Sequence, residues 1–584
     1  MAKILSISAI AHDCGVALIE DGIVKYAFEE ERFRRVKGTF IQFLFPDLSL
    51  QALEKETGIT PFDDDVIVVM SKPVLCGLDY IEKILDVKDI YLFDHHYAHA
   101  CTAYYLSGFS EETLVLTYDA GDSNGIHESV LTKEVLQKIY EQKLPFRKTE
   151  IPEEDFIKLA RGEVDREKKF FPYQVMMYPD SWWKSEDHIK NRNNCSVYIG
   201  NGSKLTNELE YRNFDSIASL WDAFCLLNNM FGGKDEGKIV GMASQGSFNT
   251  EINEAIGHFF DFNEGFFWEH YWDVRDYFES LDLKNRKIQM DASFMLQHLT
   301  EKYFLEAIGY LKQKFPSCKK LALAGGLFSN VKLNQKINEL SEFDEIFIAP
   351  GMGDGGLAIG AAIAKANELG EFDVQTIDNV FWGNKTDTNF IHPGVEETEL
   401  NYSQIASELS EGKVVGIFSN RREWGPRALG GTSIMFDPRR EDAQEYVNRR
   451  LNRNEVMPFA PVVMDGFESV PFYCYKSKYA SQFMTICYPV KEEWVNKIPG
   501  VINRFDNTSR IQIAKKDNKP FFPILEAFKE ITGVPVLMNT SFNVHGEPII
   551  NETEQAMQHL VNGVVDILVV DDKVYRKKTS VFDI

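Results

Sequence analysis

The sequence predicts an α/β protein made of two units. Short apolar runs of strand length alternate with longer segments of helical periodicity, which is typical of sheets covered by helices. At 584 residues the chain is too long for one ordinary domain. Residues 371–400 are polar and have weak periodicity, as a linker would. We therefore expect a first unit at 1–370 and a second α/β unit at 401–584.

The first unit opens with three expected strands, at residues 4–10, 16–19 and 23–29. A turn at residues 12–15 separates the first two, and the Asp-Gly pair at 21–22 predicts a two-residue hairpin between the second and the third. This opening is typical of actin- and hexokinase-type nucleotide-binding folds, in which the first loop wraps phosphates. It is also the plain hairpin of any α/β domain, and the pattern alone favours that second interpretation.

The rest of the first unit reads as alternating strands and helices. Strands are expected at 66–70, 90–93, 114–118, 321–324 and 346–350, and helices at 215–230, 291–314 and 357–369. Residues 126–235 are rich in aromatic and charged side chains and predict a helix-and-loop insertion, whereas residues 237–243 resemble a strand edge or turn. No internal repeat is apparent in the sequence.

Composition and charge exclude some classes of protein. With 63 basic and 88 acidic residues the net charge is −25, which disfavours a platform for duplex nucleic acid because that would need a basic field. The eight cysteines form no CxxC pair, so neither a zinc site nor a disulfide framework is indicated. Without a signal peptide or an apolar run of about 18 residues, we expect a cytoplasmic protein with no membrane partner. The oligomeric state stays open, with a homodimer as one alternative.

Two histidines have the spacing of metal ligands. His95 and His99 follow an expected strand and lie four residues apart, so on a helix they share one face. Asp119 ends the next strand, and Asp354 lies in a glycine-rich turn after another. Two imidazoles with one or two carboxylates suit Fe²⁺, Mn²⁺ or Zn²⁺. The alternative is a helix-capping histidine cluster with unrelated aspartates, and the spacing does not decide between them.

Glycine-rich junctions and a charged run are weaker candidates for a phosphate site. Gly325 and Gly326 follow a strand and permit close approach of a nucleotide, and Asn330 could donate to a phosphate or ribose, although such junctions are common in ordinary packing. No GxxxxGK[ST] motif is present. The run 29–37 is expected to be a solvated face, with Arg32 or Lys37 as an alternative phosphate ligand.

The second unit carries a glycine-rich loop and a local excess of arginine. The sequence Glu-Trp-Gly-Pro-Arg-Ala-Leu-Gly-Gly at 423–431 follows the apolar run 414–418, and its glycines let backbone amides approach a ligand. Guanidinium groups favour phosphate and carboxylate, so the arginines predict a polyphosphate pocket, unless they form surface salt bridges with the abundant acidic residues. The candidate anion ligands are Arg421, Arg427, Arg453, Arg510, Asn539, Thr540 and Ser541.

These motifs, in this order along the chain, resemble those of the antibiotic and nodulation O-carbamoyltransferases, including the cephamycin and tobramycin enzymes. The matching pieces are 12–13, 30–33, 95–100, 237–241, 324–330, 353–356, 423–430, 458–461 and 539–548. The resemblance implies an actin-like (ASKHA-type) transferase domain followed by a YrdC-like domain that forms carbamoyladenylate from carbamoyl phosphate and Mg²⁺-bound ATP, with Arg427 as a catalytic group. It also implies an iron-type metal held by His95, His99, Asp119 and Asp354.

Two questions follow from the resemblance. The acceptor hydroxyl needs a general base, for which we consider His12 or Asp13 in the first loop. Residues 452–458 are less basic than in the family, and 126–235 is unusual where the acceptor should bind, so the acceptor is a small molecule of open identity: a sugar, a natural product or a nucleoside. The competing functions are tRNA threonylcarbamoylation, which the charge argues against, and an actin-like kinase or ATPase, which would leave the arginines unused.

Overall fold

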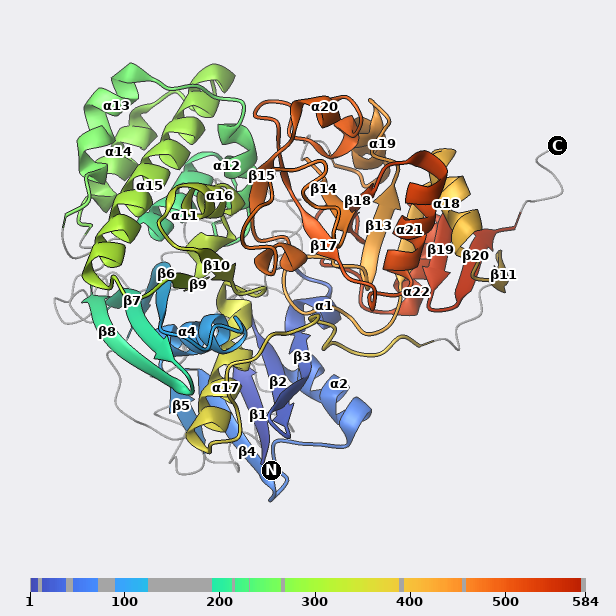
Figure 1. The fold of residues 1–584 in the computed structure, drawn as a ribbon, viewed down its shortest axis with the longest axis horizontal. Coiled ribbons are helices and arrows are strands. Elements are labelled where there is room, and N and C mark those ends of the chain that lie inside the picture. The colour runs from blue at the N-terminus through green and yellow to red at the C-terminus, as the bar shows by residue number, and fades with distance from the viewer. Residues whose placement is uncertain are drawn as a thin grey trace, which may run out of the picture. The chain divides into compact units, whose positions relative to one another are not determined.

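The protein is described by a computed structural model in which the chain forms two compact units, Met1–Asp378 and Asn379–Ile584 (Figure 1). The structure describes residues 2–8, 13–37, 46–71, 90–123, 192–212, 216–230, 232–263, 268–387, 393–453 and 458–578. Each unit is α/β, as predicted. Within these residues, no helix combines the length and the apolar character needed to cross a bilayer.

The first sheet of the first unit contains the three strands expected at the start of the chain. Its strands are β1 (Lys3–Ser8), β2 (Gly15–Glu20), β3 (Ile23–Glu29), β4 (Val66–Ser71) and β5 (Tyr91–Phe93), in the order β3-β2-β1-β4-β5. Strand β2 is antiparallel to both neighbours, whereas β1, β4 and β5 are parallel. Asp21 and Gly22 have φ of 56° and 68°, the left-handed conformation of a type I′ hairpin, so the predicted turn is confirmed.

The second sheet repeats this topology. Its strands are β6 (Thr113–Ser123), β7 (Arg192–Asn201), β8 (Lys204–Arg212), β9 (Lys320–Ala324) and β10 (Glu345–Ile348), in the order β10-β9-β6-β7-β8. Strand β7 is antiparallel to β6 and β8, and β6, β9 and β10 are parallel, as in the first sheet. The two sheets therefore share one plan, and β10 occupies in the second the place that β5 has in the first. This repeat of topology was not visible as a repeat of sequence.

Two predictions for the first unit are wrong. Residues 192–212, expected within a helix-and-loop insertion, form the hairpin β7–β8, while the preceding 124–191 lie outside the described residues. The edge strand expected at 237–243 is instead helix α12 (Glu236–Ala243), because its buried side chains Ile239, Met242 and Ala243 recur at helical spacing.

Helices cover both sheets of the first unit. The described helices are α1 (Glu30–Arg34), α2 (Asp47–Thr57), α4 (His95–Tyr105), α11 (Ile217–Leu227), α12, α13 (Thr250–Ile256), α14 (Tyr271–Ser280), α15 (Arg286–Lys314), α16 (Val331–Leu340) and α17 (Leu357–Glu368). Helices α4 and α17 follow β5 and β10 respectively and pack against each other. At their contact, a Cβ added to Gly360 would lie 1.9 Å from the carbonyl oxygen of Ala98. Only glycine permits this approach.

Replacing Gly360 by alanine should push α4 away from α17. We expect the free energy of unfolding to fall by about 1–3 kcal/mol, the usual cost of overpacking a buried contact. The matched control is Gly309→Ala in α15, because a Cβ there meets no atom within 4 Å. That variant should be neutral or more stable by up to about 1 kcal/mol, since alanine favours a helix. Chemical denaturation of both variants makes the comparison, and equal stabilities would contradict the packing argument.

The second unit is built on one mixed sheet. Its strands are β11 (Val395–Glu399), β12 (Val415–Phe418), β13 (Thr432–Phe436), β14 (Ala460–Met464), β17 (Gln512–Ala514), β18 (Val536–Ser541), β19 (Ile567–Val570) and β20 (Lys573–Lys577), in the order β11-β20-β19-β12-β13-β18-β14-β17. A separate pair is formed by β15 (Cys487–Pro489) and β16 (Thr508–Arg510). The helices are α18 (Tyr402–Ser410), α19 (Ala443–Arg450), α20 (Glu492–Val495), α21 (Phe521–Thr532) and α22 (Thr553–Val561). The interval 371–400, expected as a linker, thus contains a strand of this sheet.

The described cysteines are all free and buried. Five lie in the first unit and two in the second: Cys14, Cys101, Cys195, Cys225, Cys318, Cys474 and Cys487. Burial raises the pKa of the Cys101 and Cys195 thiols and, for Cys474, raises the pKa to about 11.

Candidate functional site

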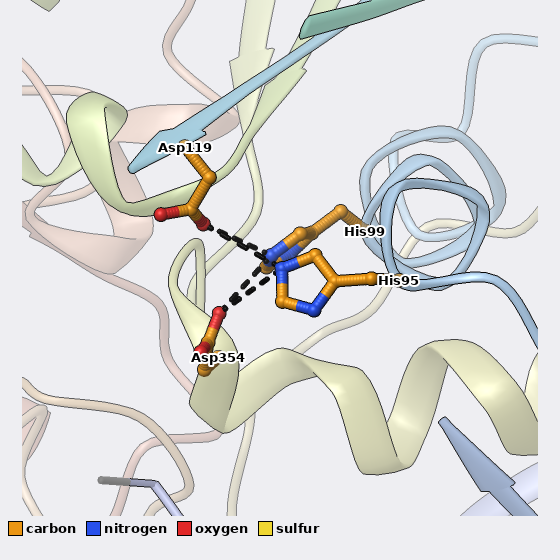
Figure 2. A group of neighbouring side chains, drawn as sticks. All are labelled: His95, His99, Asp119 and Asp354. Atoms are coloured by element: carbon orange, nitrogen blue, oxygen red, sulfur yellow. Dashed lines mark ion pairs between the residues drawn. The ribbon is translucent and has the colours of Figure 1, made fainter. Parts of the chain in front are cut away.

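Four side chains predicted as metal ligands converge in the first unit. Figure 2 shows His95 and His99 side by side on α4, with the carboxylates of Asp119 and Asp354 facing them. One ligand atom from each residue lies within 4.8 Å of all the others. His95, His99 and Asp354 are buried, and Asp119 is mostly buried.

The repeated topology explains why residues far apart in the sequence meet here. Asp94 caps α4 directly after β5, with its Oδ1 accepting from the Tyr97 backbone amide at 3.0 Å, so both histidines begin the helix on one face. Asp354 occupies the corresponding place after β10, in the turn that leads into α17. Because α4 and α17 pack together, the ligands that follow the two equivalent strands lie next to each other.

The distances fit a bound divalent ion. His99 Nε2 lies 3.3 Å from Asp119 Oδ2 and 3.4 Å from Asp354 Oδ1, and His95 Nε2 lies 3.4 Å from Asp354 Oδ1 and 3.9 Å from Asp119 Oδ2. Metal–ligand bonds of about 2.1 Å in a tetrahedron place neighbouring ligand atoms about 3.4 Å apart. Among the described residues, neither ring nitrogen of His99 has a hydrogen-bond partner, although both are buried. Two imidazoles and two carboxylates suit a first-row divalent metal.

Asp119 is held as an ionised ligand. Burial alone would favour its neutral form, but the imidazoles of His95 and His99 hold the pKa of Asp119 well below its usual range. The backbone amide of Ala120 donates to Oδ1 at 2.7 Å, and that of Gly326 donates to Oδ2 at 3.0 Å. These amides fix the orientation of the carboxylate toward the histidines.

The glycines predicted to approach a nucleotide instead approach the protein's own chain. Gly325 has φ of 104°, and a Cβ there would lie 2.1 Å from the Tyr118 carbonyl oxygen. A Cβ on Gly326 would lie 3.1 Å from Asp119 Oδ1. Both glycines therefore bring the loop after β9 against Tyr118 and Asp119, where they support the cluster of candidate metal ligands.

The third histidine of the motif faces away from the cluster. His96 Nε2 lies 2.9 Å from the Asn193 carbonyl oxygen, and Nδ1 lies 2.8 Å from Thr117 Oγ1. Because a carbonyl only accepts, Nε2 carries the proton and Nδ1 accepts from the threonine hydroxyl. Burial lowers the pKa of His96 to about 4. His96 is therefore a neutral structural histidine. The helix-capping alternative assigns such a structural role to all three histidines of the motif.

Other predicted site residues of the first unit have structural partners or lie apart. Asn330 caps α16 through Oδ1 and donates to Gln297 Oε1 at 2.8 Å, so its amide is engaged within the protein rather than poised for a phosphate. Lys37 is exposed, and its carbonyl accepts from Lys234. Asp13 lies just before β2, and His12 lies outside the described residues.

The charged run at 29–37 is not the solvated face that was expected. Glu30 is fully buried and accepts from the backbone amide and hydroxyl of Ser49 at 2.8 and 2.7 Å, which ties it to the start of α2. Arg32 is also buried, with its Nε 2.7 Å from Glu29 Oε2. The prediction failed because charges paired over short distances in the sequence can be buried together.

The glycine-rich loop 423–431 of the second unit folds around a buried carboxylate. Glu423 Oε1 accepts from the backbone amides of Leu429 and Thr432 at 2.8 and 3.1 Å, and Oε2 accepts from the Thr432 hydroxyl at 2.7 Å. Gly425 and Gly430 have φ of 101° and 118°, which the reversal of the loop requires. The motif thus encodes a rigid loop that presents Arg427.

Three amides from later in the chain hold this loop from outside. Asn539 donates to the Ala428 carbonyl at 3.0 Å, and Gln512 and Asn518 each donate to the Leu429 carbonyl at 2.8 Å. Asn539, predicted as an anion ligand, therefore uses its amide group to position the loop. Gln512 and Asn518 were not predicted, because nothing local in the sequence links them to a loop more than 80 residues away.

The arginines of the second unit divide into distinct groups. Five of the described ones pair with carboxylates, as the salt-bridge interpretation expected: Arg439 with Asp437 at 2.6 Å, Arg440 with Asp442 at 2.7 Å, Arg450 with Asp566 at 2.9 Å, Arg504 with Glu445 at 2.9 Å and Arg576 with Glu408 at 2.7 Å. Arg421 donates to the carbonyls of Trp382 and Gly383 at 2.7 and 2.8 Å. Its guanidinium therefore anchors the start of the unit instead of lying ready for a phosphate.

Arg427 and Arg510 are different. Neither has an ion-pair or hydrogen-bond partner in the described part of the chain, and both Nε atoms are buried. Burial and then the charge of Arg510 hold the pKa of Arg427 well below its usual range, and burial also lowers the pKa of Arg510. Two close cations without a carboxylate form a site that an anion would stabilise.

Arg453 lies against another predicted ligand. Its Nη1 is 3.5 Å from Thr540 Oγ1, and burial lowers its pKa to about 10. Ser541 ends β18 opposite Ser433 and is half-buried. No described contact joins Arg453 to Arg427, so the structure brings the predicted anion ligands together as two pairs.

Comparisons with known proteins cover most of the chain. A family model described as Carbamoyltransferase N-terminus matches residues 67–363, and one described as Carbamoyltransferase C-terminus matches residues 406–577. An uncharacterized protein of Methanocaldococcus jannaschii is 28% identical over 84% of this chain and 74% of its own. Nodulation protein NolNO of Sinorhizobium fredii is 25% identical over 97% of this chain and 79% of its own. A solved structure of HypF from T. kodakarensis is 13% identical with a TM-score of 0.37, over 64% of this chain and 48% of that one.

Proposed function

Since the chain belongs to the carbamoyltransferase family, and is thus an enzyme that transfers carbamoyl groups, we propose that it is an ATP-dependent O-carbamoyltransferase. The second unit forms carbamoyladenylate from carbamoyl phosphate and ATP, and the first unit passes the carbamoyl group to a hydroxyl. The observation that carries this proposal is the pair Arg427 and Arg510, two neighbouring cations whose Nε atoms are buried and which have no carboxylate partner among the described residues.

The reaction in the second unit balances with one water. Carbamoyl phosphate, ATP and water give carbamoyladenylate, pyrophosphate and inorganic phosphate. Apart from water, each reactant and product is anionic. Guanidinium groups that repel each other in the free protein are therefore stabilised when these anions bind. The loop held by Glu423 keeps Arg427 in place for this charge before substrate arrives, which is the preorganisation that electrostatic catalysis needs.

In the first unit, His95, His99, Asp119 and Asp354 would hold a divalent metal, with Fe²⁺ as the first choice and Mn²⁺ or Zn²⁺ as alternatives. The bound metal supplies Lewis-acid polarisation of the carbamoyl carbonyl. The amides of Ala120 and Gly326 keep Asp119 turned toward the histidines, and burial of the cluster excludes water from a labile mixed anhydride.

The acceptor is proposed to be a hydroxyl of a small molecule: a sugar, a natural product or a nucleoside. A tRNA acceptor is disfavoured because a net charge of −25 repels a polyanion. The first experiment needs no acceptor. Purified protein with ATP and carbamoyl phosphate should release pyrophosphate and inorganic phosphate, and neither product should exceed background when one substrate is omitted. Mass spectrometry on a panel of hydroxylated compounds then identifies the acceptor. Release of ADP instead of pyrophosphate would contradict the proposal and favour a kinase.

Separating the two units should impair the overall reaction. Within one chain the intermediate experiences an effective concentration of about millimolar, whereas mixed units at micromolar concentration lose it to hydrolysis. The cut belongs between Asp378 and Asn379, because Trp382 and Gly383 are bound to Arg421 in the second unit. The measurement compares carbamoylated product with free carbamate, using the intact chain as control. Full-rate transfer from mixed units that do not associate would show that the intermediate diffuses freely.

A further inference from the structure

Glu29 lies at the carboxyl ends of the parallel strands of the first sheet, the same end of the sheet at which the metal cluster lies. Strand β3 is antiparallel to β2, which is antiparallel to β1, so β3 runs parallel to β1 and β5. Glu29 ends β3, and His95 follows the carboxyl end of β5. The loop that leads into β2 and contains Asp13 lies at this end of the sheet too, since Gly15 pairs with Glu29.

The carboxylate of Glu29 points to the turn that carries Asp354. A Cβ built on Gly355 would lie 3.6 Å from Glu29 Oε1. The other oxygen, Oε2, accepts from Arg32 Nε at 2.7 Å, which fixes the orientation of the carboxylate. Its side chain is 17% exposed, so the group is shielded without being sealed from a ligand.

The structure assigns to Glu29 the role of proton acceptor for the substrate hydroxyl in carbamoyl transfer. This inference rests on the proposed function. The hydroxyl oxygen attacks the carbamoyl carbon, the bond from that carbon to the phosphate oxygen breaks, and AMP leaves with the electron pair. The hydroxyl proton passes to Glu29 Oε1, the oxygen that Arg32 leaves available. His12 and Asp13, considered from the sequence, are then not needed as the base.

The charges around Glu29 suit this role. Burial raises the pKa of Glu29 to about 7, which the cation of Arg32 opposes and the anions of Glu31 and Asp13 support. A general base is most effective when its pKa lies near the working pH. Because the base must be deprotonated, transfer should slow as the pH falls below about 7.

The test is Glu29→Gln in the full chain. Glutamine still accepts a hydrogen bond from Arg32 but takes up no proton, so the fold and the metal site are preserved. Glycerol serves as the probe acceptor, with water as the second acceptor that is always present. Transfer is measured as the sum of two products, the carbamate ester of glycerol and the carbamate released by reaction with water. The rate of carbamate release in His99→Ala measures spontaneous decay and is subtracted. Glu20→Gln, at the opposite end of β2, is the matched control for charge.

We expect Glu29→Gln to slow transfer by about 10²–10⁴-fold, with pyrophosphate release and metal content unchanged. The acidic limb of the pH profile, which is the fall in transfer rate at low pH, should disappear. Glu29→Asp should retain part of the rate and keep this acidic limb. Unchanged transfer, or a limb that persists in Glu29→Gln, overturns the assignment. Loss of metal in Glu29→Gln also overturns it, because the role would then be structural. If wild-type protein releases no pyrophosphate, the proposed function itself fails and this inference falls with it.

Discussion

Arg427→Ala is expected to abolish carbamoyladenylate formation without unfolding the protein. In the free protein Arg427 lies beside Arg510, and no described residue supplies a counter-charge, so the cation is held in place for an anionic ligand. Its removal should cost about 2–5 kcal/mol of binding or transition-state stabilisation. The measurement is pyrophosphate release from ATP and carbamoyl phosphate. Activity close to that of wild type would refute the assignment of this loop.

The matched control is Arg439→Ala, which removes an arginine already paired with Asp437 in the same unit. That variant should keep its activity. Thermal stability also distinguishes Arg427→Ala from wild type. Arg427→Ala removes a buried repulsion, so its melting temperature in phosphate-free buffer should not fall. Pyrophosphate at a hundred times its Kd should stabilise the folded wild type by about 2.7 kcal/mol and so raise its melting temperature. The melting temperature of Arg427→Ala should stay unchanged.

The second large effect is expected for His99→Ala. His99 is fully buried, and its Nε2 faces the oxygens of Asp119 and Asp354 at 3.3 and 3.4 Å. Without this ligand the protein should bind no stoichiometric metal. Carbamoyl transfer should fall by about 10³-fold or more, because the Lewis acid supplies several kcal/mol. Pyrophosphate release should remain, since that step is assigned to the other unit.

His96→Gln is the internal control for this result. His96 neighbours the ligands in the sequence, but its ring is bound to Thr117 and Asn193. The variant should lose stability by about 1–3 kcal/mol because a buried hydrogen-bond partner is replaced, yet keep one metal per chain. Elemental analysis of both variants decides the matter. If His96→Gln lost the metal and His99→Ala kept it, the ligand set would be wrong.

The part of the site that could be predicted was local in the sequence. The four-residue spacing of His95 and His99 is a property of one helix, and the structure places both rings on one face. That Asp354 joins them depends on the repeated topology of two sheets whose sequences show no repeat. The local pattern identified the candidate ligands. Why they meet is explained only by the equivalent positions of β5 and β10 in the two sheets.

Short polar side chains were the hardest to assign. An asparagine after a glycine-rich junction can donate to a phosphate or cap the next helix, and Asn330 does the second. The arginines raise the same difficulty, because Arg439 pairs with a carboxylate two residues away whereas Arg450 pairs with Asp566, 116 residues later in the chain. Arg427 and Arg510 differ because no such partner occurs for them in the part of the chain that the structure describes, and that is a property of the fold rather than of the sequence.

The buried cysteines give each unit its own chemical reporter of local opening. A thiolate is the reactive form, and burial raises the pKa of Cys101 in the first unit and of Cys474 in the second, so modification by an alkylating reagent requires exposure. Labelling followed by peptide mass spectrometry therefore measures how often each unit opens, without any engineered probe. Substrates that engage one unit should slow the alkylation of its own thiols only, so the order of ligand binding becomes readable from the native chain.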